Sequence, residues 1–188
     1  MVIASPRVGR LPSSETALIG RSGDIETARR LLDSHRLVTL TGAGGSGKTR
    51  MAIAVATSVA DDYRDGVTYV ALQDARDQVA VAAATAAALG IQQDVGVDPQ
   101  ESIATYLTDR ESLVVLDNFE QVLAAAPFIS ALLRASSSLR LIVTSRAPLR
   151  LSGEQEYEVL PLDDDAAVAL FAERARAVRP GARGSAPA

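Results

Sequence analysis

The sequence has no cysteine and no tryptophan, and only one histidine and one lysine among its 188 residues. Without cysteine the chain forms no disulfide and has no thiol chemistry, as is typical of cytoplasmic proteins. It has no run of Lys or Arg and a net charge of −4, so we expect no face that contacts nucleic acid. Its apolar stretches are too short to cross a bilayer, and residues 1–10 lack the apolar core of a signal peptide. These absences predict a soluble, cytoplasmic domain with no membrane contact.

The lone lysine lies in a glycine-rich loop, while every other basic residue is an arginine. Backbone N–H groups of such a loop converge on phosphate oxygens, the lysine neutralises the β- and γ-phosphates, and the next hydroxyl ligates Mg²⁺. We therefore predict that this segment, with Arg50 beside it, binds a nucleotide and that Thr49 holds Mg²⁺. The loop matches the pattern G-x-x-x-x-G-K-[ST] with Gly42, Ala43, Gly44, Gly45, Ser46, Gly47, Lys48 and Thr49.

Strand and helix patterns alternate along the chain. This alternation predicts an α/β fold, with a five-stranded, mainly parallel sheet and helices on both faces. We divide the chain into an extended lead-in (1–17), a nucleotide-binding domain (18–178) and a flexible tail (179–188). The expected strands are 36–41, 66–72, 112–117, 139–144 and 157–160. The expected helices begin at Asp24, capped by Ser22 or Asp24, and continue with 48–60, 77–89, 99–108, 120–134 with a break at Pro127, and 163–178.

Asp117 ends the apolar strand at 112–117. A carboxylate at this place holds Mg²⁺ through water in phosphate-loop proteins, and we assign Asp117 that role. Many ATPases of this broad class carry a second acid at the next position, where it activates the attacking water. Here that residue is Asn118, which cannot accept a proton at neutral pH. Glu120 is a candidate substitute, although an acid is also favoured at a helix start for its charge alone. Slow hydrolysis is the expected result.

Two further segments are candidates for nucleotide contact. Arg146 follows the strand at 139–144, where a planar guanidinium can sense the γ-phosphate, and Arg150 is a weaker second candidate. The only histidine, His35, is expected to cap a helix end rather than to act in catalysis. The segment Leu18-Ile19-Gly20-Arg21 offers an apolar pair, backbone groups and one guanidinium to an adenine ring.

The motifs resemble, in order and spacing, the nucleotide-binding domain of the signal-transduction ATPases with numerous domains, the NB-ARC-like group. The likeness covers about residues 18–178 and is strongest to bacterial ATPases joined to LuxR-type, SARP-type or adenylate-cyclase modules. It implies a P-loop fold in which the strand at 139–144 lies between the loop strand and the Asp117 strand. It also implies that residues 18–21 wrap adenine and that Arg146 is the sensor arginine. The matching segments are 18–21, 36–50, 65–72, 113–122, 139–162 and 167–175.

The resemblance further implies a switch in which ADP holds a closed form and ATP opens it for signalling or assembly. Family members place a helical domain and a winged helix after this region. We expect those domains to be missing partners of this chain, which alone would be monomeric and would not build the closed state. The longer protein is expected to oligomerise with ATP.

Four functions remain to be weighed from the sequence. The first is an ATP/ADP regulatory switch with slow hydrolysis, and the second is a working ATPase of motor or remodelling type completed by partner subunits. The others are a small-molecule kinase, for which we find no acceptor-binding base or Arg-rich lid, and an interaction module with a vestigial site. A GTPase with the motif N-K-x-D is excluded, because no second lysine exists to form it.

Overall fold

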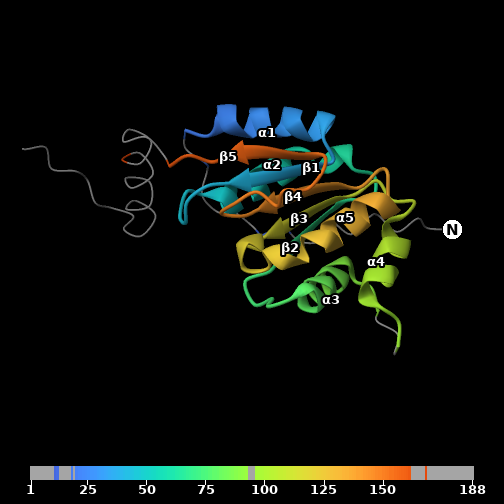
Figure 1. Ribbon diagram of the computed structural model, residues 1–188. Coiled ribbons are helices and arrows are strands. Elements are labelled where there is room, and N and C mark those ends of the chain that lie inside the picture. Colours follow the sequence, from blue (N-terminus) through green and yellow to red (C-terminus); the bar gives the residue numbers. More distant parts are fainter. Residues whose placement is uncertain (1–10, 13–17, 19, 93–95, 162–167, 169–188) are drawn as a thin grey trace, which may run out of the picture.

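The sheet consists of five parallel strands, in the order β2-β3-β4-β1-β5. The computed structural model describes residues 11–12, 18, 20–92, 96–161 and 168. β4 lies between β1 and β3, as the family resemblance implies, and all strand carboxyl ends meet at one edge, on the left in Figure 1. The strands are β1 (Leu37–Thr41), β2 (Val67–Ala71), β3 (Leu113–Asp117), β4 (Arg140–Thr144) and β5 (Glu154–Glu158).

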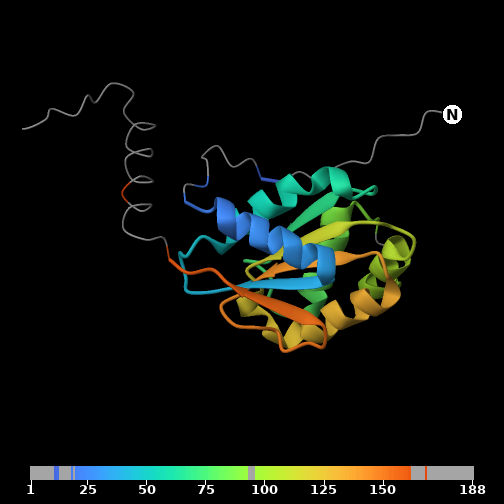
Figure 2. The same cartoon turned by 90° about the horizontal axis from the view of Figure 1, so that it is seen from above.

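Helices cover both faces of this sheet (Figures 1 and 2). On one face lie α1 (Ser22–Ser34) and α2 (Lys48–Ser58), and on the other lie α3 (Gln78–Leu89), α4 (Pro99–Leu107) and α5 (Ala126–Ala135). Successive side chains of a strand point to opposite faces, so Val114 and Leu116 pack with α3–α5 while Leu113 and Val115 pack with α1 and α2. β1 and β3 are buried throughout for this reason.

Local signals set the ends of several helices. The side chain of Asp77 accepts a hydrogen bond from the backbone N–H of Ala80 at 2.8 Å and begins α3, and Gly90 ends this helix with φ of 71°. Pro99 lies in the first turn of α4. Short 3-10 turns at Phe119–Gln121 and Leu123–Ala125 precede α5, so the predicted break in the 120–134 helix is confirmed.

Two predicted boundaries are wrong. α1 begins at Ser22 and has no side-chain cap, because the Asp24 carboxylate bonds the side chains of Arg21 and Tyr157 instead. The fifth strand was expected at 157–160 and lies at Glu154–Glu158. Its glutamates are poor strand formers by propensity, but charged residues suit an exposed edge strand, where they discourage pairing with another chain.

Other expectations fall on residues that the structure does not describe. They are most of the lead-in, the tail, and the helix at 163–178 apart from Val168. Among the described residues, no helix is long and apolar enough to cross a membrane.

Candidate functional site

The loop between β1 and α2 requires glycine where the chain passes another backbone. Gly42 has φ of 139°, and a Cβ atom there would lie 2.5 Å from the carbonyl oxygen of Val159, just after β5. Gly47, with φ of 95°, leads directly into α2. The loop therefore presents its backbone at the amino end of an eleven-residue helix, where N–H groups and the helix dipole favour an anion.

Lys48 is only 8% exposed and bonds the loop itself. Its Nζ donates to the carbonyl oxygens of Gly42 at 2.9 Å and Ala43 at 2.8 Å. An ammonium has three protons, so one remains for a phosphate oxygen. These two hydrogen bonds hold the ammonium group against the loop that the sequence predicted to bind phosphate.

Asp117 collects hydroxyl groups from three different elements. Its Oδ1 accepts bonds from Thr49 Oγ1 at 2.8 Å and Thr144 Oγ1 at 2.5 Å, and its Oδ2 accepts one from Tyr69 Oη at 2.7 Å. Because Thr49 donates its proton to the carboxylate, its oxygen lone pairs are free to ligate a cation. The predicted pair of Thr49 and Asp117 thus lies together, while Tyr69 and Thr144 were missed.

Burial and the hydrogen bond to Asp117 raise the pKa of Tyr69 well above its ordinary value. Its hydroxyl is therefore protonated at neutral pH and donates to the carboxylate. The only signal for this residue in the sequence is its place in the second strand, which says nothing about which carboxylate it reaches.

Arg146 lies at the mouth of the loop and forms an ion pair with Glu120. The Nε atom of Arg146 is 3.3 Å from Glu120 Oε1, and its side chain is 68% exposed. A Cβ at Gly44 would lie 3.7 Å from an Arg146 guanidinium nitrogen, so this cation lies beside the loop. The other oxygen of Glu120, Oε2, is buried and lacks a hydrogen-bond partner among the described residues. The structure therefore brings together two predicted residues that the sequence left separate.

Asn118 adopts the left-handed conformation, with φ of 65°, which asparagine tolerates better than most residues. Its backbone N–H donates to Thr144 Oγ1 at 2.9 Å. This bond links the residue after Asp117 to the strand that leads to Arg146. Asn118 thus has a conformational role that is independent of proton transfer.

The segment 18–21 reaches the site through its last residue. Arg21 is buried, and its Nη2 donates to the carbonyl oxygens of Ser46, at 3.2 Å, and Leu160. Its Nη1 bonds Asp24 at 2.8 Å, and Tyr157 Oη donates to the same carboxyl at 2.6 Å. Burial tends to raise the pKa of Asp24, but these two hydrogen bonds outweigh it and lower that pKa.

The rest of this segment and its neighbours have fewer described contacts. Leu18 is half-buried and Gly20 is exposed, while Ile19 lies outside the described residues. Arg50 is half-buried in the first turn of α2. The role of residues 18–21 and of Arg50 in nucleotide contact stays a prediction.

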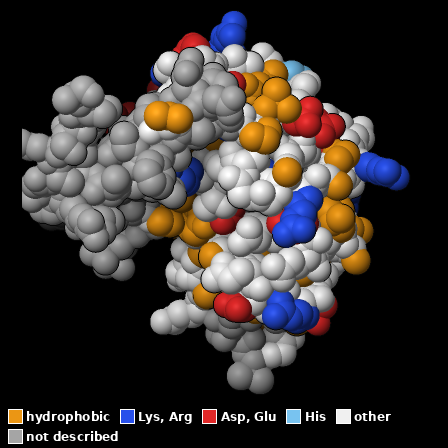
Figure 3. All heavy atoms as spheres, turned by 90° about the vertical axis from the view of Figure 1, so that its left-hand side faces the viewer, with side chains coloured by type: hydrophobic (Ala, Val, Ile, Leu, Met, Phe, Trp, Pro, Cys, Tyr) orange, Lys and Arg blue, Asp and Glu red, His pale blue; other side chains and the backbone are white. Residues whose placement is uncertain are grey.

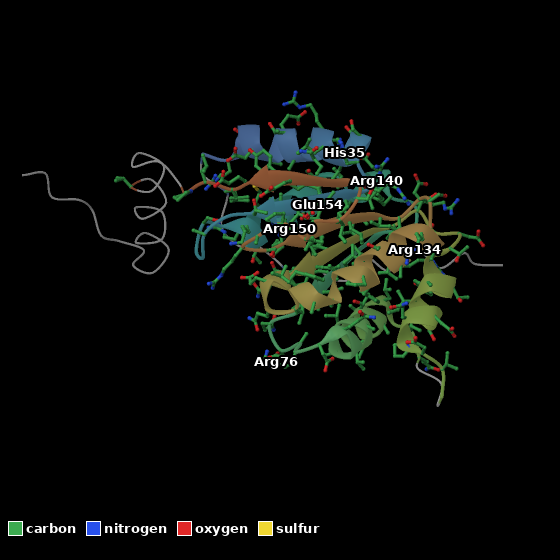
Figure 4. All side chains as sticks on the ribbon, in the orientation of Figure 1. His35, Arg76, Arg134, Arg140, Arg150 and Glu154 are labelled. Carbon is green, nitrogen blue, oxygen red and sulfur yellow. The ribbon has the colours of Figure 1, made fainter. Side chains whose placement is uncertain are left out.

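A hollow of about 510 Å³ lies at the opposite end of the sheet, where β1 begins. Figure 4 shows His35, Arg134 and Arg140 at this end. His35 Nδ1 lies 3.2 Å from the carbonyl oxygen of Leu31, as expected for a group at the end of α1. Arg140 bonds the carbonyl oxygen of His35 at 3.1 Å, so this arginine also serves a helix terminus. The chemistry of this hollow is that of helix ends, and the predicted site residues lie elsewhere.

Figure 3 views the end of the molecule where the strands finish, although grey atoms cover part of it. On the described surface, basic side chains stand singly among acidic and apolar ones. Arg150, the weaker candidate, is exposed with φ of 59°, and no hydrogen bond links it to the loop among the described residues. Of the two arginines, only Arg146 is placed beside the loop.

Comparison with known proteins gives one family. The sequence pattern of the NB-ARC domain matches residues 24–178. A protein of Mycobacterium tuberculosis named "Putative HTH-type transcriptional regulator" is 41% identical over 155 residues, which are 81% of this chain and 17% of that protein. An uncharacterized protein of the same species is 35% identical over 166 residues, 87% of this chain and 42% of that one. The chain therefore spans less than half the length of these curated relatives.

Solved structures share the fold at low sequence identity. Cdc6p from Pyrobaculum aerophilum aligns with a TM-score of 0.68 and 18% identity, covering 90% of this chain and 52% of that chain. A STAND protein with a tetratricopeptide repeat sensor from Pyrococcus horikoshii aligns with a TM-score of 0.54 and 16% identity, covering 94% and 28%. At such identities the likeness is one of fold, that of P-loop NTPases.

Proposed function

Because this chain belongs to the NB-ARC family, we propose that it is an ATP/ADP-binding regulatory switch domain with slow ATP hydrolysis. We place it within a multidomain bacterial signal-transduction or transcription regulator, as the name of its 41%-identical relative suggests. The observation that carries the proposal is the convergence of Lys48, Thr49 and Asp117 at the loop with Arg146 at its mouth.

The residues present fit a nucleotide with Mg²⁺. Thr49 and Asp117 offer a hydroxyl and a carboxylate, the hard oxygen ligands that Mg²⁺ takes alongside phosphates and water. The buried Oγ of Ser46 has no protein partner among the described residues, as expected of a hydroxyl within a phosphate cradle. When bound, Mg²⁺ supplies charge neutralisation to the β- and γ-phosphates.

Each residue then has a task. Lys48 binds the β- and γ-phosphate oxygens, Thr49 and Asp117 hold the cation, and Arg146 turns from Glu120 towards a γ-phosphate. Arg21 fixes the carbonyl oxygen of Ser46. A ligand shifts a conformational balance only by its difference in affinity for the two states. Arg146 can contact the γ-phosphate of ATP, which ADP lacks. ATP therefore favours the state in which Arg146 reaches the phosphates, and ADP does not.

Slow turnover follows from the residues around Asp117. Asn118 cannot act as a base, and Glu120, two residues further along the chain, is the acid that we assign to orient water. In the described structure one oxygen of Glu120 is engaged by Arg146, which lowers its availability.

We further propose that the domain alone is monomeric and that following helical and winged-helix domains complete the closed form.

A working ATPase is the second candidate, and one observation favours it. Oε2 of Glu120 is buried and free of protein partners among the described residues, as a base that holds a water must be. Such an ATPase would need a partner subunit to supply a further cation.

Steady-state hydrolysis and ADP release separate the two functions. A switch should retain ADP and turn over ATP at about 10⁻² per second or slower, the range of unassisted nucleotide switches. Turnover on the order of 10 per second, typical of enzymes, would favour the motor. The Lys48→Ala variant serves as the control, and nucleotide binding equal to that of the parent would refute the phosphate-loop assignment itself.

A further inference from the structure

We propose that Tyr69 is a positioning residue of the cation site: its hydroxyl fixes the Asp117 carboxylate in the orientation that holds Mg²⁺. The proposal rests on the proposed nucleotide function and adds a residue to it. Tyr69 neither belongs to the loop nor follows a strand end, and among the described residues its hydrogen bond to the site is the one to Asp117.

The sheet register places the phenol to reach Asp117. β2 and β3 are adjacent, with Tyr69 opposite Val115 and Ala71 opposite Asp117. Val115 belongs to the α1–α2 side of the sheet, and the Tyr69 ring packs against the same cluster. Asp117 is two residues beyond Val115 and so projects to that side as well. The tyrosine side chain spans this step, and its hydroxyl lies 2.7 Å from Oδ2.

The three hydroxyl groups that donate to Asp117 are divided unevenly between its two carboxylate oxygens. Thr49 and Thr144 both bond Oδ1, whereas Tyr69 is the only described donor to Oδ2. Rotation of the carboxylate about its Cβ–Cγ bond would break the bonds at both oxygens, and Tyr69 supplies the bond that resists it at Oδ2. One lone pair of Oδ2 remains for a water on the cation.

A fixed carboxylate matters because Mg²⁺ demands near-ideal octahedral geometry. Residues that orient a cation-holding group typically contribute about 10- to 100-fold to metal affinity. The alternative is that the Tyr69 hydroxyl merely competes with the cation for Oδ2. That alternative predicts the opposite sign, since removing the hydroxyl would then strengthen Mg²⁺ binding.

The test compares the affinity of a non-hydrolysable ATP analogue in Mg²⁺ and in EDTA by titration calorimetry. Tyr69→Phe keeps the ring and removes the hydroxyl. We expect the gain in affinity from Mg²⁺ to fall by about tenfold, with the affinity in EDTA unchanged. Tyr63→Phe is the control, because Tyr63 packs in the same cluster but makes no hydrogen bond to Asp117 within the described part of the chain.

The outcomes are distinguishable. A parent protein that gains no affinity from Mg²⁺ would contradict the proposed function. A parent that gains affinity while Tyr69→Phe gains as much, or more, would overturn the role of Tyr69. An equal loss in Mg²⁺ and EDTA would mean a general structural effect and also overturn it. Thermal melting checks that each variant is folded, and Tyr69→Leu, measured in the same way, must show the same loss.

Discussion

Lys48 differs from the arginines in the size of its charged group and in the groups that surround it. Its ammonium sits on two adjacent carbonyl oxygens at the start of the loop and keeps a proton for a phosphate. The guanidinium of Arg36 also bonds two carbonyl oxygens, those of Leu133 and Ser136. Those oxygens lie at the carboxyl end of α5, however, and a planar fork suits them. A compact charge is required only inside the loop, where the single lysine stands.

The ion pair between Arg146 and Glu120 gives a prediction at this scale. Arg146→Ala should lower affinity for an ATP analogue by about 10- to 150-fold while affinity for ADP changes little, because a hydrogen bond to a charged group contributes about 1.5–3 kcal/mol. Glu120→Gln should instead raise the preference for ATP by no more than a few-fold, since an ion pair with one exposed partner contributes about 0–1 kcal/mol. Titration with both nucleotides measures the two ratios.

Arg150→Ala is the matched control for this pair of variants. Arg150 is an exposed arginine four residues further on, without a hydrogen bond to the loop in the described part of the chain. If Arg150→Ala lowered the ATP-to-ADP preference as much as Arg146→Ala, the sensor role of Arg146 would be wrong. An unchanged preference in Arg146→Ala would lead to the same conclusion.

At the scale of elements, β1, the loop and α2 depend on the chain that leaves β5. The Val159 carbonyl oxygen lies where a Cβ of residue 42 would be, at 2.5 Å, whereas a Cβ at Gly45 meets nothing within 4 Å. Both glycines have positive φ, 139° and 81°. Substitutions at Gly42 and Gly45 therefore separate the cost of backbone strain from the cost of a collision between a Cβ atom and the Val159 carbonyl oxygen.

Gly42→Ala should destabilise the protein by about 2–5 kcal/mol, because a positive φ and a collision with backbone add together. Gly45→Ala should cost only about 1–2 kcal/mol, the strain alone. Urea unfolding of the parent and both variants measures the difference. Equal losses would mean that β5 does not constrain the loop.

The sequence predicted the site residues that follow the strand ends, but not the side chain of a neighbouring strand that bonds one of them. The loop and Asp117 follow from motifs with fixed spacing, and the order of β1, β4 and β3 follows from the family resemblance. The bond from Tyr69 depends on the register of β2 against β3, which no local pattern encodes. β5 was misplaced because its edge position, and the Glu154 bonds to the backbone of Leu149 and Leu151, override strand propensity.

At the scale of the molecule, the candidate site joins all five strands. Residues 42–49 follow β1, Asp117 ends β3, and Arg146 follows β4. Tyr69 brings β2 to the carboxylate, and Val159 and Leu160 bring the chain after β5 to the loop and to Arg21. A ligand bound here would contact, directly or through one residue, every strand of the sheet. Its binding should therefore stabilise the whole fold rather than one loop.

A nucleotide that binds only the folded state stabilises it by RT ln(1 + [L]/Kd), which is about 2.7 kcal/mol at a hundredfold excess over Kd. For a domain of this size, each kcal/mol raises Tm by about 2–4 °C. Mg²⁺ with ADP at that excess should therefore raise Tm by about 5–10 °C in one cooperative transition, followed by circular dichroism. Lys48→Ala at the same nucleotide concentration should shift far less, because it loses the phosphate contact. If the nucleotide raised the Tm of only a minor early transition, binding would stabilise the loop alone and not the sheet.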